Sequence, residues 1–377
     1  MDERNLTLEV FILAQYVFQS PGRYIQGTGT LKRLGEETEK LAHNPLVISD
    51  EMVWSITGET VTDSFENTDI DFVYEEFNGE ASENEIDRLT TSGQDNDVDI
   101  IIGVGGGKTL DTAKAIADNL KTRAIIVPTT ASTDAPTSSL SVIYSDEGEF
   151  TGYRFYNRNP DLILIDSGIV VNAPLKLFAA GMSDAMATLV EARATLKRKG
   201  ENMVDGQPTL ASVAIAEKCE ETLFNHGEAA YKAAAKGFVT PQVDSVIEAN
   251  TLLSGLGFEN GGLAAAHAIH NGFTSLSGDI HHLSHGEKVA YGTLVQLVLE
   301  NSADDTMHKY IDFYQKIGMP TTLKDMHLED TSYEDLVKVG ELATDPGDTF
   351  SNLDDKITPE GVATAILAVN EISQETK

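Results

Sequence analysis

The chain has 377 residues, 41% of them hydrophobic, and a formal net charge of −33 at pH 7. This length allows two domains with well-formed cores, and the hydrophobic content excludes an intrinsically disordered chain. The acidic excess excludes nucleic acid and anionic membranes as partners, because it repels polyanions. Such an excess is tolerable where salt shortens the screening length, so we expect a salt-rich cytoplasm resembling that of halophiles.

Cysteine content and hydropathy exclude several further classes. The only cysteine, Cys219, excludes a disulfide framework and a cysteine-based zinc site. The N-terminus lacks the basic start and apolar run of a secretory signal, and no stretch approaches the ~20 apolar residues needed to span a bilayer. We therefore expect a soluble, cytoplasmic protein.

The first half of the chain alternates short apolar runs with helical patterns. The predicted strands are 45–50, 69–74, 98–104, 123–128 and 162–166, and the predicted helices are about 31–43, 52–66, 82–93 and 108–120. Because the strands are continuously apolar and alternate with helices, they predict a parallel α/β sheet. Residues 141–152 instead predict a hairpin with an acidic turn.

The character of the chain changes after Pro174, where strand patterns almost vanish. The predicted helices there are about 175–199, 209–224, 226–236, 241–256, 260–271, 285–301 and 304–317. A helix start at Pro174 places the boundary between an α/β domain, 1–173, and a helical domain, 174–377. We expect the functional site in the cleft between these two domains.

A strand, three consecutive glycines and a helix follow one another over 99–114. Glycine permits a sharp turn and lets bare backbone lie against a ligand, and the helix start attracts an anion. This arrangement predicts a site for a diphosphate, with a dinucleotide as the ligand; the alternative is a tight connection between layers. Gly103 and Gly107 enclose three residues where a P-loop needs four, and Lys108 stands where a Rossmann fingerprint has glycine.

Two other segments follow predicted strands and carry groups that suit a nucleotide. The loop 129–138 offers hydroxyls and backbone N–H groups, although it can equally be a polar loop bounded by proline. Asp50 can hold a ribose 2′-OH, which favours NAD over NADP, or it can cap the helix that follows.

Asp184, His267 and His285, all in the helical half, are candidates for a metal site. Asp184 lies in a helix of small residues, where an inward carboxylate is costly without a partner. Two histidines and one aspartate suit zinc with an open fourth position. Five of the nine histidines fall between 267 and 285, namely His267, His270, His281, His282 and His285. Spacing alone distinguishes neither ligands from core histidines nor Zn²⁺ from Fe²⁺.

Five motifs, in order and spacing, resemble the glycerol dehydrogenase family of the iron-containing-type, metal-dependent alcohol dehydrogenases. They are GGGKTLDTAK (105–114), PTTASTDAP (128–136), GMSDA (181–185), GGLAAAHAIHNG (261–272) and HGEKVA (285–290). The resemblance implies a dehydroquinate synthase-like fold, with a Rossmann-like α/β domain that binds NAD and an all-α domain that holds one zinc ion. It also implies a small polyol substrate and a homo-oligomer, commonly an octamer.

The resemblance assigns roles to individual residues. It implies metal ligation, and with it catalysis and substrate contact, by Asp184, His267 and His285, and it places the glycerol hydroxyls on Asp134. It places the cofactor on Asp50, Gly106, Gly107, Lys108, Thr129, Thr130, Ser132, Ser138, Leu140 and Tyr144. Thr188 stands where iron-using relatives carry a histidine, which favours the zinc branch of the superfamily.

The implied activity is NAD-dependent oxidation of glycerol at C2 to dihydroxyacetone, with zinc assisting hydride transfer. The alternatives are sn-glycerol-1-phosphate dehydrogenase, another polyol dehydrogenase, 3-dehydroquinate synthase and a non-catalytic dinucleotide sensor. Phosphorylated substrates need cations near the metal, yet Lys288 is the only one between Lys236 and Lys309. The three metal-ligand candidates argue against a sensor. No dedicated protein base is evident, so the proton can leave through water or a spare histidine such as His270.

Overall fold

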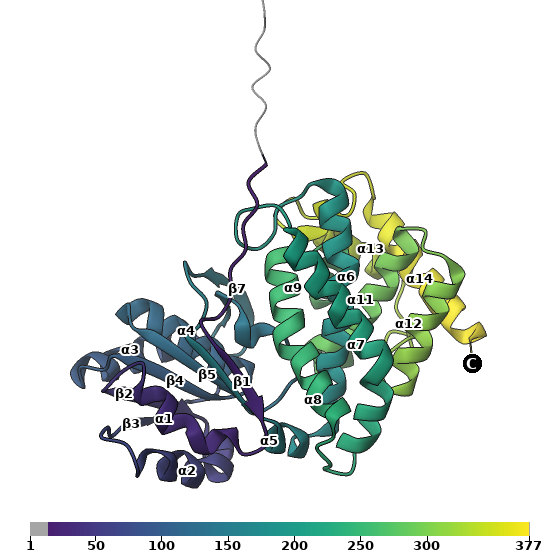
Figure 1. Ribbon diagram of the computed structural model, residues 1–377. Coiled ribbons are helices and arrows are strands. Elements are labelled where there is room, and N and C mark those ends of the chain that lie inside the picture. The colour runs from purple at the N-terminus through teal and green to yellow at the C-terminus, as the bar shows by residue number, and fades with distance from the viewer. Residues whose placement is uncertain (1–13, 377) are drawn as a thin grey trace, which may run out of the picture.

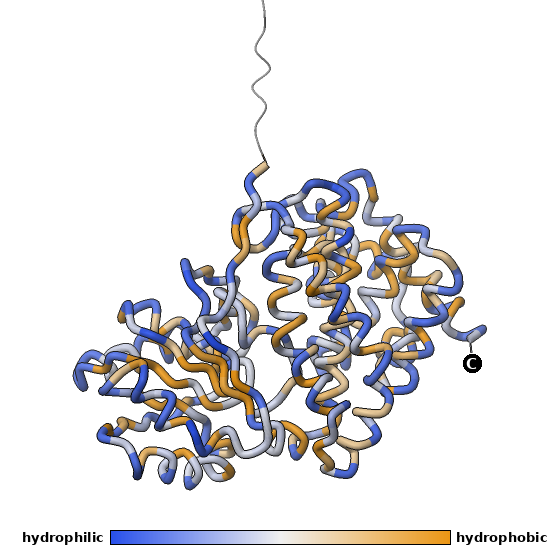
Figure 2. The backbone as a smooth tube through the Cα atoms, in the orientation of Figure 1, coloured by the Kyte–Doolittle hydropathy of each residue, from blue (hydrophilic) through white to orange (hydrophobic). Residues whose placement is uncertain are grey.

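The computed structural model describes residues 14–376. It places a sheet with its helices on one side of the molecule and a group of helices on the other (Figure 1). Residues 1–13 of the predicted N-terminal domain, and Lys377, lie outside the described residues. Hydrophobic segments concentrate along the central strands, whereas the outer helices alternate in hydropathy (Figure 2). Within residues 14–376, none of the helices has the length and apolar character of a membrane-spanning segment.

Six parallel strands form the sheet, in the order β1-β8-β5-β4-β2-β3. Their bounds are β1 Tyr24–Gly27, β2 Pro45–Ser49, β3 Val73–Glu76, β4 Ile100–Gly105, β5 Arg123–Pro128 and β8 Leu162–Asp166. Every residue of β2, β4 and β8 is buried, which explains why these strands are continuously apolar in the sequence. The predicted parallel α/β sheet is therefore confirmed.

Helices cover both faces of the sheet. Their bounds are η1 Thr30–Arg33, α1 Leu34–Glu39, α2 Glu51–Phe65, α3 Glu83–Asp95, α4 Gly107–Leu120 and α5 Ser167–Asn172. Apolar side chains of α1 and α2 pack against one face, and those of α3 and α4 pack against the other. The core on the α4 side continues into the helical half, so the two halves share buried surface.

Local details of the first half differ from the sequence predictions. The strand predicted at 69–74 is β3, Val73–Glu76, and the helix predicted at 31–43 is a short 3₁₀ turn followed by α1. The edge strand β1 was not predicted, because its four half-buried residues are too few to show a periodic pattern. The predicted hairpin is present, with strands β6 Leu140–Tyr144 and β7 Phe150–Phe155.

The second half is helical, as predicted. Its bounds are α6 Leu175–Arg198, α7 Leu210–Ala234, α8 Pro241–Glu248, the π-helical η3 Ala249–Leu253, α9 Ser254–Gly261, α10 Ala265–Gly272, η4 Phe273–Ser275, η5 Asp279–His282, α11 His285–Leu299, α12 Asp304–Lys316, α13 Tyr333–Ala343, η6 Thr349–Asn352 and α14 Pro359–Glu375. The helix α6 is central, since it packs against α7, α9 and α11 and is buried along most of its length.

Two predictions about helix ends are wrong. The expected break near residue 225 is absent, because α7 continues through Gly227. A Cβ at this glycine would lie 2.6 Å from a ring atom of Phe313, so glycine allows close helix packing here rather than ending the helix. The helix predicted at 241–256 extends through η3 and α9 to Gly261. The helices α13 and α14 had no counterpart among the predictions.

Candidate active site

The sheet order creates a crevice at the carboxyl ends of two neighbouring strands. From β2 the chain continues to β3, toward one edge of the sheet. From β4 it continues to β5, toward the opposite edge. Where connections diverge in this way, the space beyond the strand ends is open to a ligand. Asp50 follows β2 directly and the glycine run ends β4, so both lie at this crevice.

The glycines at the end of β4 and the start of α4 serve two different purposes. A Cβ at Gly103 would lie 2.6 Å from the Cβ of Ala113, so this glycine lets β4 and α4 pack closely. A Cβ at Gly106 or Gly107 would meet no atom within 4 Å, and Gly106 starts α4 without a side-chain cap. The backbone dihedrals of these glycines are ordinary, with φ of −85° at Gly106. The expected sharp turn is therefore not the reason for glycine here. Open space beside uncapped helix N–H groups is the feature that fits a diphosphate.

Lys108 and Asp50 both have protein partners at this crevice. The ammonium group of Lys108 lies 2.6 Å from Glu80 Oε1 and 5.1 Å from the centre of the Tyr144 ring. This places Tyr144, from the hairpin, beside the start of α4, and it adds Glu80, which was not predicted. Asp50 caps α2, accepting from the N–H of Val53 at 2.9 Å. The capping alternative is thus present, and it uses one of the two carboxylate oxygens.

The hydroxyl-bearing loop follows β5, the strand next to β4. The N–H of Thr129 donates to the carbonyl of Gly105, which ties this loop to the glycine run. The hydroxyls of Thr130 and Ser132 lie 3.1 Å apart. Ser138 donates to the carbonyl of Ala135 at 3.0 Å and leads into Leu140 at the start of β6. These residues occupy the loop and the hairpin base on the crevice side of β5.

Asp184, His267 and His285 converge from three different helices. They belong to α6, α10 and the first residue of α11, and one ligand atom from each lies within 4.8 Å of the others. Asp184 is fully buried, and its Oδ1 is 3.0 Å from His285 Nε2 and 3.4 Å from His267 Nε2. One carboxylate oxygen and two imidazole nitrogens are a donor set that suits zinc or iron.

The other three histidines of the cluster are placed differently. The Nε2 atom of His270 lies 3.2 Å from His285 Nδ1, so His270 contacts a candidate ligand rather than the carboxylate. His281 Nε2 donates to the carbonyl of Leu276, and His282 is exposed at the surface. His267 and His285 are therefore the histidines of this cluster whose Nε2 atoms lie beside Asp184, which spacing along the chain could not show.

Comparisons with known proteins agree with this geometry. Residues 21–167 match the family model described as iron-containing alcohol dehydrogenase. The chain is 44% identical to glycerol dehydrogenase of Citrobacter freundii, over 95% of this chain and 98% of that one. It is 43% identical to glycolaldehyde reductase of Halobacterium salinarum, over 96% and 99%. The crystal structure of glycerol dehydrogenase from Schizosaccharomyces pombe superposes with a TM-score of 0.93 at 41% identity, covering 96% of this chain and 92% of that one. The chain belongs to the glycerol dehydrogenase family.

In this member of the glycerol dehydrogenase family, two carboxylates share the buried centre of the site. The N–H of Asp134 donates to Asp184 Oδ2 at 3.3 Å, and Ser254 donates its hydroxyl to Asp134 Oδ2 at 2.7 Å. Burial alone would raise the pKa of Asp184, but His285 and His267 hold it well below its usual range. Burial and the charge of Asp184 raise the pKa of Asp134 well above its usual range. The two neighbouring carboxyl groups therefore have pKa values shifted in opposite directions.

Further side chains complete the site, and the sequence analysis did not single them out. Glu191 Oε2 lies 2.6 Å from His267 Nδ1. Tyr153 lies on β7, and burial raises the pKa of its hydroxyl, although the charge of His267 lowers it. Glu191 follows Asp184 by seven residues, or two helical turns, which is a signal that could have found it. Tyr153 offers no comparable local signal.

Thr188 lies four residues after Asp184, where iron-using relatives were expected to carry histidine. Its hydroxyl is 2.8 Å from that of Ser254, the residue that donates to Asp134. Among the described residues, the grouped metal-ligating side chains are the three named above, and Thr188 adds no fourth nitrogen ligand.

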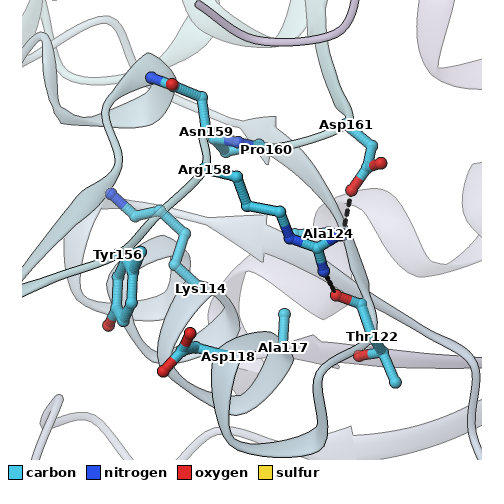
Figure 3. Close-up of a pocket in the computed structure, with 10 residues that line it drawn as sticks. All are labelled: Lys114, Ala117, Asp118, Thr122, Ala124, Tyr156, Arg158, Asn159, Pro160 and Asp161. Atoms are coloured by element: carbon cyan, nitrogen blue, oxygen red, sulfur yellow. Dashed lines mark hydrogen bonds between the residues drawn. The ribbon is translucent and has the colours of Figure 1, made fainter. Parts of the chain in front are cut away.

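Two cavities of the molecule lie away from this site. A cavity of about 30 Å³ lies beside the C-terminal end of α4, where Lys114, Tyr156 and Asp161 are among the lining residues (Figure 3). There Arg158 donates to the carbonyl of Thr122 (Figure 3). A larger cavity of about 270 Å³ lies between the hairpin end and residues 202–205. Neither is lined by a predicted site residue, so side-chain chemistry, not cavity size, identifies the site.

Proposed function

We propose that this chain catalyses NAD-dependent oxidation of glycerol at C2 to dihydroxyacetone. One observation carries the proposal: Asp134, from the loop after β5, touches Asp184 at the centre of the His and Asp cluster. This contact brings the nucleotide side of the sheet and the candidate metal ligands to one place. The curated glycerol dehydrogenases that align over nearly the whole chain support the same reaction.

The proposed site divides the work among residues of both halves. A divalent cation held by Asp184, His267 and His285 would supply Lewis-acid chemistry to a substrate hydroxyl, and NAD would accept the hydride. Asp134, whose pKa is raised by burial and by the charge of Asp184, would orient a second hydroxyl of glycerol. The free N–H groups at Gly106 and Gly107 would bind the pyrophosphate, with Lys108 beside it. Holding the cofactor and C2 of glycerol in register lowers the entropy cost of the reaction.

The remaining cofactor contacts belong to the same proposal. Asp50 would hold the ribose through the carboxylate oxygen that does not cap α2. The residues that would line the rest of the cofactor are Thr129, Thr130, Ser132, Ser138, Leu140 and Tyr144.

We propose zinc as the metal. Three protein ligands that leave one position open are the arrangement of catalytic zinc, and Thr188 replaces the histidine expected of iron-using relatives. Elemental analysis of the purified enzyme should find one zinc per chain. Removal by a strong chelator should abolish activity, and Zn²⁺ should restore it. Activity that survives complete metal removal would contradict the metal assignment.

Substrate assays test the reaction itself. We expect NADH formation with glycerol, and NADH consumption with dihydroxyacetone. The 43% identical relative named glycolaldehyde reductase makes glycolaldehyde a second candidate substrate, since it also carries a hydroxyl beside a carbonyl. Activity confined to glycerol 1-phosphate would overturn the proposal.

Larger-scale features complete the proposal. We place the domain boundary between residues 173 and 174, supported by the end of β8 at Asp166 and the start of α6 at Leu175. The homo-oligomeric state and the cytoplasmic location stay predictions, and light scattering of the purified enzyme tests the first of them.

A further inference from the structure

The helix that carries His267 starts without a capping side chain of its own. The residue before α10 is Ala264, which has no side-chain oxygen, so the first N–H groups of the helix need acceptors from elsewhere. Glu191 Oε1 accepts from the N–H groups of Ala264 and His267 at 2.9 and 3.0 Å. Gln296 Oε1 accepts from the two N–H groups between them, at 3.0 and 2.8 Å. Side chains from α6 and α11 therefore cap α10 together.

Glu191 has a second contact that Gln296 lacks. Its other carboxylate oxygen, Oε2, lies 2.6 Å from Nδ1 of the His267 ring. Because a carboxylate only accepts hydrogen bonds, this contact places a proton on Nδ1. The opposite ring nitrogen, Nε2, then points at Asp184, 3.4 Å from its Oδ1. Glu191 is fully buried and shares α6 with Asp184, so the ring and the carboxylate ligand are held by one helix.

We propose that Glu191 is a positioning residue for the metal: it orients His267 so that Nε2 presents its lone pair to the cation beside Asp184. This role rests on the metal site of the proposed function. A carboxylate is required because all three groups that contact Glu191 are N–H donors. An amide at this position would turn one of its two ends into a donor, which would face either the His267 ring or the backbone N–H groups. Such outer contacts typically fix ring orientation and raise ligand basicity.

The competing explanation is that Glu191 only caps α10. Gln296 provides the control, since it caps the same helix start from α11 without touching the His267 ring. If capping were the whole role, Gln296→Leu, which removes a capping acceptor altogether, should weaken metal binding at least as much as Glu191→Gln, whose amide oxygen can still cap. If ring orientation is the role, only the change at Glu191 should do so.

The experiment measures Zn²⁺ affinity of the metal-depleted full-length protein by competition with a chromophoric chelator. We expect Glu191→Gln to lose about 10- to 100-fold in Zn²⁺ affinity. Gln296→Leu should bind Zn²⁺ as tightly as the wild type, even if it melts at a lower temperature. NADH binding, followed by fluorescence, should be unchanged in both variants. The visible spectrum of the Co²⁺-loaded protein should shift in Glu191→Gln only, because the geometry of one ligand changes.

Unchanged Zn²⁺ affinity in a folded Glu191→Gln variant, or equal losses in both variants, would overturn the inference. If Glu191→Gln does not fold, Glu191→Asp replaces it in the experiment. Aspartate keeps both acceptor oxygens but is too short to reach the His267 ring and the backbone N–H groups together. Unchanged Zn²⁺ affinity, or a loss equal to that of Gln296→Leu, would again overturn the inference. Failure of the proposed function is distinguishable: a wild type that binds Zn²⁺ but does not oxidise glycerol refutes the reaction and leaves the affinity comparison intact.

Discussion

Asp134 and Asp184 meet in the buried centre of the molecule, where the backbone N–H of Asp134 donates to Asp184 Oδ2 at 3.3 Å. Asp134 comes from the loop after a sheet strand and Asp184 from the central helix α6. The charge of Asp184 raises the pKa of Asp134, and the pKa values of the two carboxyl groups move in opposite directions. One contact therefore joins the loop after β5 to the candidate metal ligands on the helices.

Replacing the buried ligand tests its role directly. We expect Asp184→Asn to abolish turnover and zinc binding, because a neutral amide is a poor ligand, while the fold and NADH binding survive. Zinc content, NADH fluorescence and circular dichroism measure the three properties. Asp330→Asn, a change at an exposed position, serves as the control and should behave as the wild type. An Asp184→Asn variant that fails to fold would favour a purely structural role for this carboxylate.

The neighbouring carboxylate should act on the substrate rather than on the metal. We expect Asp134→Asn to lower kcat/KM for glycerol by about 10- to 100-fold, the range for losing one strong hydrogen bond. Zinc content should stay at the wild-type value. Ser254→Ala, which removes the hydroxyl that donates to Asp134, should cause a smaller loss. Steady-state kinetics with glycerol test this prediction. An unchanged kcat/KM in Asp134→Asn would refute contact between Asp134 and the substrate.

Gly103 and Gly107 should respond differently to replacement by alanine. Gly107→Ala should leave thermal stability nearly unchanged, because the added Cβ meets open space, but it should weaken NADH binding. Gly103→Ala should destabilise the protein by about 1–3 kcal/mol, because its Cβ would overlap Ala113. Fluorescence titration and thermal unfolding separate the two effects. Tight NADH binding by Gly107→Ala would contradict the placement of the pyrophosphate.

Acid should weaken the sheet half through Glu85. Burial alone would raise the pKa of Glu85, but an ion pair with Arg88 at 2.8 Å and the N–H of Asn78 lower it overall. An acid whose pKa is lowered by folding stabilises the fold above its unfolded pKa of about 4.3, and that contribution is lost as the pH falls through the folded value. In urea unfolding, Glu85→Gln should be less stable than the wild type at neutral pH, and the difference should shrink in acid.

The matched control for this pH effect is Glu59→Gln, which changes an exposed carboxylate in α2. Its free energy of unfolding should follow that of the wild type at both pH values. A difference between Glu85→Gln and wild type that persists undiminished in acid would show that lost packing, rather than lost charge, explains the variant.

Salt should stabilise a chain with a net charge of −33. Raising ionic strength from about 0.1 to 1 M shortens the screening length from roughly 10 to 3 Å, which reduces repulsion between surface carboxylates. We expect the melting temperature and activity to rise over this range in NaCl. Full folding and activity at low ionic strength would refute a salt requirement and the expectation of a salt-rich cytoplasm.

The parallel sheet, the helical half and the order of the family motifs could be predicted from the sequence, because these depend on near neighbours in the chain. Apolar runs and helical periodicity report which side of an element is buried. They do not report which partner covers it, so a helix break was predicted near residue 225, within α7, where Gly227 instead lets Phe313 pack closely. Two roles were expected of the glycine run, a sharp turn and bare backbone open to a ligand; the dihedrals are ordinary, and open space lies beside Gly106 and Gly107.

Long-range packing determines which side chains meet. Asp184, His267 and His285 lie on three helices whose packing sets their separation, and no spacing along the chain encodes that distance. The contact of Glu191 with the His267 ring likewise depends on how α6 and α10 are placed. Local sequence patterns therefore identified the candidate functional groups, and long-range packing determines which of them lie together in the site.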